Sequence, residues 1–184
     1  MPPHSDRGVA LVVALMTMLL LTAMGAALVL TTSAEALLSF GFRGSQQALY
    51  AADAAAEWAI ADLAAVVPDW STLVEEAVRS PFVDGPAAGT RVLLDGSVVD
   101  LSVVVARNAA WHPYAFGRMK DLLPPTDWPS PFYVVVLVAE DPQGPDRLRM
   151  RTESFGPRGA HKVLELNVSR SPAGVRFEAW QEVR

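Results

Sequence analysis

The chain has 184 residues, a formal net charge of -5 and no cysteine. The absence of cysteine excludes a disulfide framework, a thiolate metal site and thiol catalysis. Charges of both signs are interspersed, and no stretch is rich enough in lysine and arginine to follow a phosphate backbone, so we expect no nucleic-acid partner. The positive mean hydropathy exceeds what one modest globular domain accounts for, and it predicts a strongly apolar element in addition.

That element lies near the N-terminus, where residues 8–34 contain no charged side chain. At about 1.5 Å per residue, residues 9–30 are long enough to cross a hydrocarbon core of about 30 Å. A core helix of a soluble domain is usually shorter and keeps a polar face, which this segment lacks. We therefore predict that residues 9–34 form the transmembrane half of a long helix.

A cleaved secretory signal peptide is the main alternative, because it also places a basic residue before an apolar stretch. The apolar stretch here is longer than a usual signal-peptide core of about 7 to 15 residues, which favours an anchor that is retained. Arg7 precedes the stretch, so the positive-inside rule predicts a cytoplasmic N-terminus and places the remainder in the periplasm or outside the cell.

The helix is expected to continue beyond the membrane as an amphipathic half, residues 35–67. Apolar side chains recur there at three- and four-residue steps, which gives one face for packing on a domain. Gly41 and Gly44 predict a kink or melted turn within residues 39–44. Pro68 is expected to end the helix, so residues 68–184 form the globular domain.

Several features of the N-terminal segment occur in a recognisable order. They are an Arg-Gly pair, an apolar run ending in Leu-Thr-x-x-Gly, a Thr/Ser step, a glutamate and an alanine-rich stretch with one aromatic residue. Here they are Arg7-Gly8, Leu21-Thr22-Ala23-Met24-Gly25, Thr31-Thr32-Ser33, Glu35 and Ala48-Leu49-Tyr50-Ala51-Ala52-Asp53-Ala54. Together they resemble a class III prepilin leader followed by the N-terminal domain of the PilX family of minor pilins, over about residues 7–60.

The resemblance implies a pilin fold and a processing site. Residues 1–8 would be the leader, which prepilin peptidase removes between Gly8 and Val9 before it methylates the new amine of Val9. Val13 would then be the fifth mature residue, where main pilus subunits carry a glutamate that pairs with the terminal amine of a neighbouring subunit. A subunit at the tip has no subunit above it to pair with. We therefore expect a tip or initiation complex that primes filament assembly, with adhesion left open.

Two further positions are candidates for assembly. Gly25 and its small neighbours allow close contact with other helices. Glu35 is the first charge beyond the anchor, and it either marks the membrane boundary or contacts a neighbouring subunit. The resemblance implies other minor and major pilins, prepilin peptidase and the inner membrane as partners. The C-terminal domain would be periplasmic before assembly and on the pilus or cell surface afterwards.

The globular domain is predicted to be an antiparallel sheet preceded by a short helix at residues 70–79, capped by Asp69 or Ser71. An Asp95-Gly96 turn predicts a hairpin. The predicted strands are residues 90–94, 98–106, 132–139, 147–155, 161–169 and 175–182. Alternating polarity in residues 147–155 and 161–169 predicts one packed face and one wet face. A sheet laid on the second half of a long helix gives an α+β, pilin-like fold.

Residues 108–131 are predicted to form a long irregular loop, which in a compact domain is usually functional. Because Trp and Tyr dominate binding hot spots, Trp111, Tyr114 and Trp128 are candidates for a partner surface. The alternative is that the aromatic side chains of this loop fold inward as a lid over the sheet.

Catalytic and metal chemistry have little support. His4, His112 and His161 lack the spacing of metal ligands, and there is neither a phosphate-binding loop nor a nucleophile elbow. Asp141 and Asp146 flank a turn and could hold calcium only weakly, and the adjacent carboxylates Glu140 and Asp141 should point apart.

We therefore predict a structural, noncatalytic minor pilin without a cofactor, a metal or a small-molecule substrate. The alternatives are a type II secretion pseudopilin, an unprocessed membrane-anchored binding or sensory protein, and an enzyme.

Overall fold

The computed structural model describes residues 6–66, 70, 73–74, 78–122, 130–172 and 174–183. The chain divides into two compact units, Met1–Phe42 and Arg43–Arg184. The first unit and the start of the second share one helix, α1 (Asp6–Val66), which is α-helical throughout. The melted turn predicted within residues 39–44 is therefore not formed. A glycine costs only about 1 kcal/mol in a helix, and the residues around Gly41 and Gly44 are compatible with helix.

The segment after α1 is described only in part. Leu73 and Val74 are helical, whereas Trp70, Val78 and Arg79 are not. The short helix predicted over residues 70–79 is therefore confirmed at residues 73–74, but its predicted ends are wrong. Pro68, the expected helix terminator, and the expected caps Asp69 and Ser71 lie outside the described residues.

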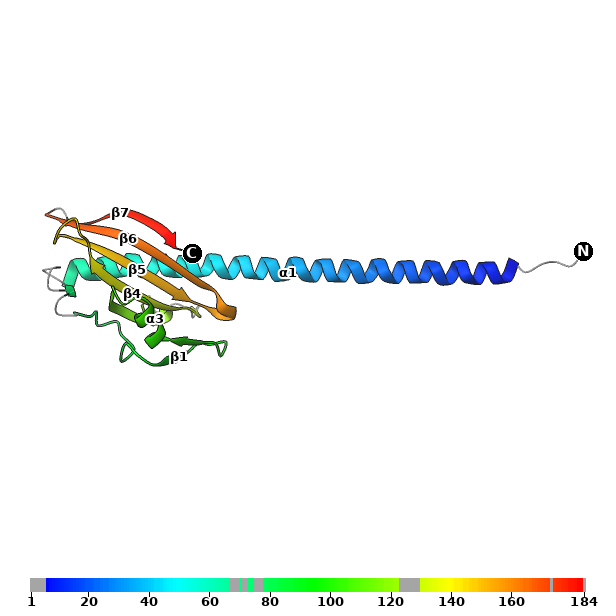
Figure 1. The fold of residues 1–184 in the computed structure, drawn as a ribbon, viewed down its shortest axis with the longest axis horizontal. Helices are drawn as coiled ribbons and strands as arrows, with labels where there is room; N and C mark the ends of the chain where they lie inside the picture. The colour runs from blue at the N-terminus through cyan, green and yellow to red at the C-terminus, as the bar shows by residue number, and fades with distance from the viewer. Residues whose placement is uncertain are drawn as a thin grey trace, which may run out of the picture. The chain divides into compact units, whose positions relative to one another are not determined.

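The second unit is built on a five-stranded antiparallel sheet with the order β3-β4-β5-β6-β7 (Figure 1). The strands are β3 (His112–Arg118), β4 (Tyr133–Glu140), β5 (Arg147–Phe155), β6 (His161–Ser171) and β7 (Gly174–Val183). Each strand pairs with the next along the chain, so the predicted meander is confirmed for β4 to β7. The turn between β5 and β6 contains the 3-10 helix η1 (Pro157–Gly159).

Strand β3 corrects the prediction of an irregular loop over residues 108–131. Pro113 pairs with Leu137 and Ala115 with Val136, so Tyr114 is the extra residue of a bulge. Proline cannot donate a ladder hydrogen bond, which confines it to bulges and edge strands such as this one. The short helix α4 (Met119–Leu122) follows the strand.

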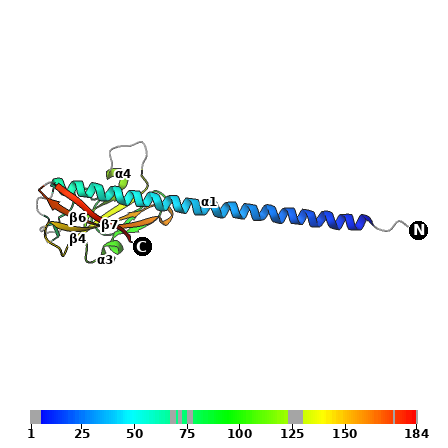
Figure 2. The same ribbon diagram turned by 90° about the horizontal axis from the view of Figure 1, so that it is seen from above.

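Strand β4 is buried on both faces because a hydrophobic layer covers each face of the sheet. Val134, Val136 and Val138 pack with the residues of α1 that face the sheet, which are Ala48, Ala51, Ala52, Ala55, Ala56, Ala59 and Leu63. Tyr133, Val135 and Leu137 join a second cluster on the opposite face, with Leu93, Val99, Leu101 and Val104. Figure 2 accordingly shows the second half of α1 and the helix α3 (Leu101–Arg107) on opposite sides of the sheet.

The predicted hairpin is confirmed, but its second strand is shorter than expected. β1 (Thr90–Val92) pairs with β2 (Val98–Asp100) around a turn in which Gly96 has a φ of 82°. The strand predicted to reach Ala106 is wrong, because α3 begins at Leu101. The Asp100 carboxylate caps α3 by accepting hydrogen bonds from the N–H groups of Ser102 (2.9 Å) and Val103 (3.4 Å). The cap and the burial of two α3 side chains outweigh the low helix propensity of valine.

Candidate functional site

The apolar half of α1 exposes its side chains instead of burying them. Its most hydrophobic stretch of 18 residues has a mean hydropathy of 2.4, and none of that stretch is buried. Val9 and Val13 are 64% and 56% exposed. A core helix of a soluble domain would be mostly buried, so this half of α1 has the length, the composition and the exposure of a membrane-spanning helix.

Hydroxyl groups are the polar side chains of this half, and each is satisfied within the helix. Every hydroxyl donates a hydrogen bond of 2.7 to 2.9 Å to the carbonyl oxygen four residues earlier; the donors are Thr17, Thr22, Thr31, Thr32 and Ser33. An unsatisfied polar group costs several kcal/mol in hydrocarbon. Threonine and serine in a helix can donate in this way to the preceding turn, and here the bonds remove this cost.

The predicted processing and assembly residues all lie on α1. Gly8 and Val9 fall in its first turn, and Val13, Gly25 and Glu35 follow along the same helix. All five are exposed. A Cβ added to Gly8 or Gly25 would meet no atom within 4 Å. These positions are thus open to lipid or to another chain.

The three aromatic candidates for a partner surface differ in their surroundings. Tyr114 is 1% exposed, and its hydroxyl donates a 2.6 Å hydrogen bond to Asp62 of α1. Burial, together with this carboxylate, raises the pKa of Tyr114 well above its ordinary value. Trp128 lies outside the described residues. Trp111 is half-buried, with the guanidinium of Arg149 5.1 Å from its ring centre, so it is the described candidate that offers surface to a partner.

The alternating polarity of residues 147–155 places Glu153 with Arg149 and Arg151 on the predicted wet face, and the structure corrects this prediction for Glu153. Its side chain is 1% exposed and accepts hydrogen bonds from Asn108 (2.9 Å) and Arg151 (2.9 Å), while His161 lies 3.1 Å away. Burial alone would raise the pKa of Glu153, but the hydrogen bonds from His161, Arg151 and Asn108 outweigh it and hold the pKa below its ordinary value. Asn108, Arg151 and His161 surround the carboxylate, so its role is structural.

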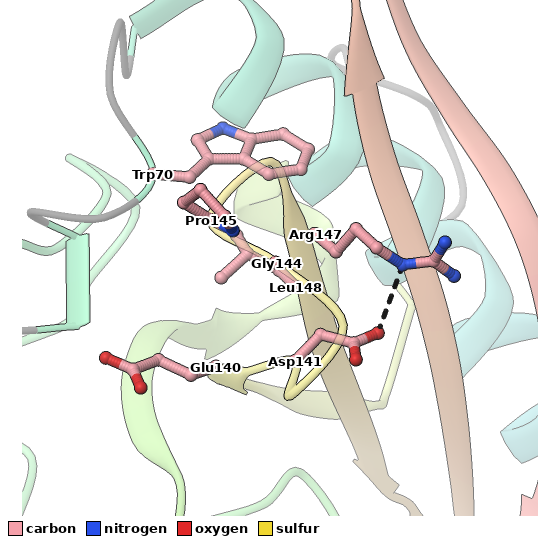
Figure 3. Close-up of a pocket in the computed structure, with 7 residues that line it drawn as sticks. All are labelled: Trp70, Glu140, Asp141, Gly144, Pro145, Arg147 and Leu148. Carbon is pink, nitrogen blue, oxygen red and sulfur yellow. Dashed lines mark hydrogen bonds and ion pairs between the residues drawn. The ribbon is translucent and has the colours of Figure 1, made fainter.

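A cavity of about 230 Å³ lies between Trp70 and the turn that joins β4 to β5 (Figure 3). The Asp141 carboxylate accepts hydrogen bonds from Arg147 Nε (3.5 Å) and the N–H of Gln143 (2.9 Å). Figure 3 shows the Glu140 and Asp141 carboxylates pointing in opposite directions, as predicted. Arg147 therefore supplies the positive charge beside Asp141, and the described residues contain no cluster of three or more metal-ligating side chains.

The fold and the exposed apolar helix define a pilin-like α+β protein. Residues 7–57 match the family model described as PilX N-terminal, over nearly the range in which the resemblance was predicted. These residues are thus similar to the N-terminal segment of PilX-type pilins, and the match supports a minor pilin of a type IV pilus. Pilins are structural proteins and not enzymes. Neither the curated proteins nor the solved structures contain a match to the chain.

Proposed function

We propose that this chain is a minor pilin that acts at or near the tip of a type IV pilus, within an initiation complex that primes filament assembly. The observation that carries the proposal is the exposed, internally satisfied apolar half of α1, within the segment that matches the PilX family. Such a helix joins other helices through close packing of small residues, and Gly25 offers no side chain to oppose that approach.

Val13 supports a position at the tip. In the register that the resemblance implies, Val13 stands where main subunits have a glutamate for the neighbouring terminal amine. A buried carboxylate is costly without a partner, so a subunit with no neighbour above it gains from an apolar side chain there. Glu35 is the first charged residue after the apolar residues 9–34. It is proposed to contact a neighbouring subunit in the filament.

The proposed processing site is the bond between Gly8 and Val9. It lies in the first turn of α1, where backbone N–H groups lack helical partners and the helix frays. Cleavage there leaves the anchor in the mature protein. We further propose that the N-terminus is cytoplasmic and the sheet domain is exported.

The intact mass of the membrane-bound protein tests this processing. The expected mature chain begins at Val9 and carries one added methyl group, and Gly8→Leu should leave residues 1–8 in place. A product that begins beyond Ser33 would show a cleaved signal peptide. An uncleaved wild-type chain would show a plain membrane-anchored protein.

Copy number tests the position at the tip. We expect far fewer copies per filament than of the main subunit, and loss of pili when the chain is deleted. A stoichiometry equal to that of the main subunit along the shaft contradicts the proposal. Loss of protein secretion with normal pili would instead indicate a secretion pseudopilin. Adhesion is tested separately, by comparing surface binding between strains with equal numbers of pili.

A further inference from the structure

The sheet face opposite α1 carries polar side chains in cross-strand rows over β5, β6 and β7. One row is Arg149, Asn167 and Ala179, and the next is Arg151, Glu165 and Gln181. Asn167 and Ala179 are shorter than their neighbours in the adjacent row. On β6 and β7, the side chains in the row of Arg149 therefore rise less far above the sheet than those in the adjacent row.

The three arginines on this face of β5 differ in their partners. Arg147 pairs with Asp141 and Glu178, and Arg151 pairs with Glu153 (2.9 Å) and Glu165 (2.5 Å). Arg149, between them, forms no ion pair with any described residue. Its Nε donates a 3.2 Å hydrogen bond to the backbone oxygen of Glu140, and its guanidinium lies against the ring of Trp111.

A groove of about 280 Å³ opens at the row of Arg149. Trp111 lines it beside the arginine. The other lining residues are Glu165, Leu166, Asn167, Ala179, Trp180 and Gln181. The Asn167 amide has no hydrogen-bond partner within the described part of the chain, and Gln181 donates a single long bond of 3.3 Å to Glu165. The groove thus combines an arginine that has no carboxylate partner among the described residues, side-chain amides that can form further hydrogen bonds, and the indole of Trp111.

We propose that this groove binds an acidic side chain presented by a neighbouring pilus subunit, with the carboxylate on Arg149 and the adjoining peptide groups on Asn167. The proposal rests on the proposed function and names the chemistry of its partner contact. Arginine holds a carboxylate through two parallel hydrogen bonds, and arginine and tryptophan are enriched at the energetic centres of interfaces. The groove has one available cation and a carboxylate, Glu165, in its wall, so a single acidic residue fits it better than a polyanion does.

Site-specific photo-crosslinking in piliated cells tests the proposal on the full-length chain. Gln181 is replaced by p-benzoylphenylalanine, and the crosslinked peptides are identified by mass spectrometry. We expect adducts with a different pilus subunit, through a peptide that contains Asp or Glu. Arg149→Glu should lower the crosslink yield about tenfold, the factor expected when a charged hydrogen bond is lost, and Arg149→Lys should retain part of it.

Two controls separate binding from folding. Arg176→Glu reverses an exposed charge on the same face of β7, outside the groove, and should leave the yield unchanged. Replacing the crosslinked acid of the partner with Lys should restore the yield in the Arg149→Glu chain only. This charge exchange would not rescue a misfolded domain.

Three results would overturn the proposal: no protein adduct at residue 181, an adduct only with a second copy of this chain, or a yield that does not respond to Arg149→Glu. Pilus number and N-terminal mass are measured in the same strains. If these agree with a processed minor pilin while the crosslink fails, the groove is wrong and the proposed function stands. If they fail as well, the proposed function is itself wrong.

Discussion

The hydroxyl of Tyr114 donates a 2.6 Å hydrogen bond to the carboxylate of Asp62, and this bond joins the bulged edge strand β3 to α1. The two residues are 52 positions apart, so the bond forms only when the sheet is packed on the helix. The bulge makes this contact possible, because it places Tyr114 and Ala115 together in the cluster that contains α1. Tyr114 therefore reports on the packing of helix and sheet.

Removing the hydroxyl of Tyr114 should weaken the packing of the helix against the sheet without leaving a cavity in the core. We expect Tyr114→Phe to lower the free energy of unfolding by about 1 to 2 kcal/mol, because a hydrogen bond to a charged group is lost while half-buried Asp62 can still meet water. Denaturant unfolding of the full chain in detergent, followed by tryptophan fluorescence, measures the change. In a double-mutant cycle with Asp62→Asn the two effects should be coupled. Purely additive effects would show that the bond does not contribute.

The buried carboxylate of Glu153 should make the domain sensitive to acid. Its pKa in the folded state lies below the ordinary value of 4.5, so its contribution to stability is complete above that pH. The contribution is lost as the pH falls through the folded-state pKa, because the unfolded chain binds the proton more readily. We expect Glu153→Gln to cost about 2 to 3 kcal/mol at neutral pH, as charged hydrogen bonds are lost.

The pH profile of unfolding provides the check on Glu153. The stability difference between wild type and Glu153→Gln should shrink as the pH is lowered below 4.5. The exposed residue Glu140 supplies a matched control, and Glu140→Gln should run parallel to wild type. A constant difference between wild type and Glu153→Gln at every pH would show that the titration of Glu153 is not linked to folding.

Loss of the Asp100 cap of α3 should be detectable at the individual backbone amides that it binds. We expect Asp100→Ala to lower stability by about 1 kcal/mol, whereas Asp100→Ser keeps a side-chain acceptor and most of the stability. Hydrogen exchange gives the sharper readout, because the amides of Ser102 and Val103 donate to the Asp100 carboxylate. They should exchange faster in Asp100→Ala. Unchanged exchange at both amides would mean that the cap does not hold the first turn.

Substitution by alanine should change the stability of the domain in opposite directions at two glycines, Gly156 and Gly44. A Cβ at Gly156 would overlap the ring of buried Phe132, whereas a Cβ at Gly44 would have its nearest neighbour, the Cβ of Ala160, at 3.8 Å. We expect Gly156→Ala to destabilise the domain by about 1 to 3 kcal/mol through overpacking. Gly44→Ala should stabilise it by about 0.5 to 1 kcal/mol, because Gly44 is in a helix.

Thermal unfolding of the two alanine variants tests this contrast. The cost of Gly156→Ala should fall in a Phe132→Leu background, where a smaller side chain leaves room for the new methyl group. If the cost is the same in both backgrounds, the contact with the Phe132 ring is not its cause.

The strands of the meander could be predicted from the sequence because their signals are local. Polarity alternates along β5 and β6, and the turns that follow β4, β5 and β6 each combine proline and glycine within residues 141–145, 156–159 and 171–174. The predicted bounds of β4 to β7 agree with the structure to within two residues.

Strand β3 and helix α3 could not be predicted in the same way. Pro113 argues against a strand unless a bulge is known, and Val103, Val104 and Val105 favour a strand unless the Asp100 cap and the burial of Leu101 are known. In both segments a tertiary contact decides the local structure.

Some surface features could likewise be predicted from the sequence, and others could not. The exposed apolar helix was evident from composition, and Trp111 was a candidate because of its residue type. Arg149 looks the same in sequence as Arg147 and Arg151. Only the strand register shows that its two neighbours face carboxylates while Arg149 forms no ion pair among the residues that the structure describes. The burial of Glu153 likewise depends on Asn108, which is 45 positions away.

In the proposed filament subunit, the back-bonded hydroxyls of α1 would affect how the helix moves from lipid to a protein neighbour. Because each of these groups already has its acceptor four residues earlier in the same helix, the segment has no polar contact to break when it leaves a bilayer and none to rebuild when it returns. The free energy of exchange between lipid and a protein neighbour would then depend on how well the apolar side chains of the two helices fit together.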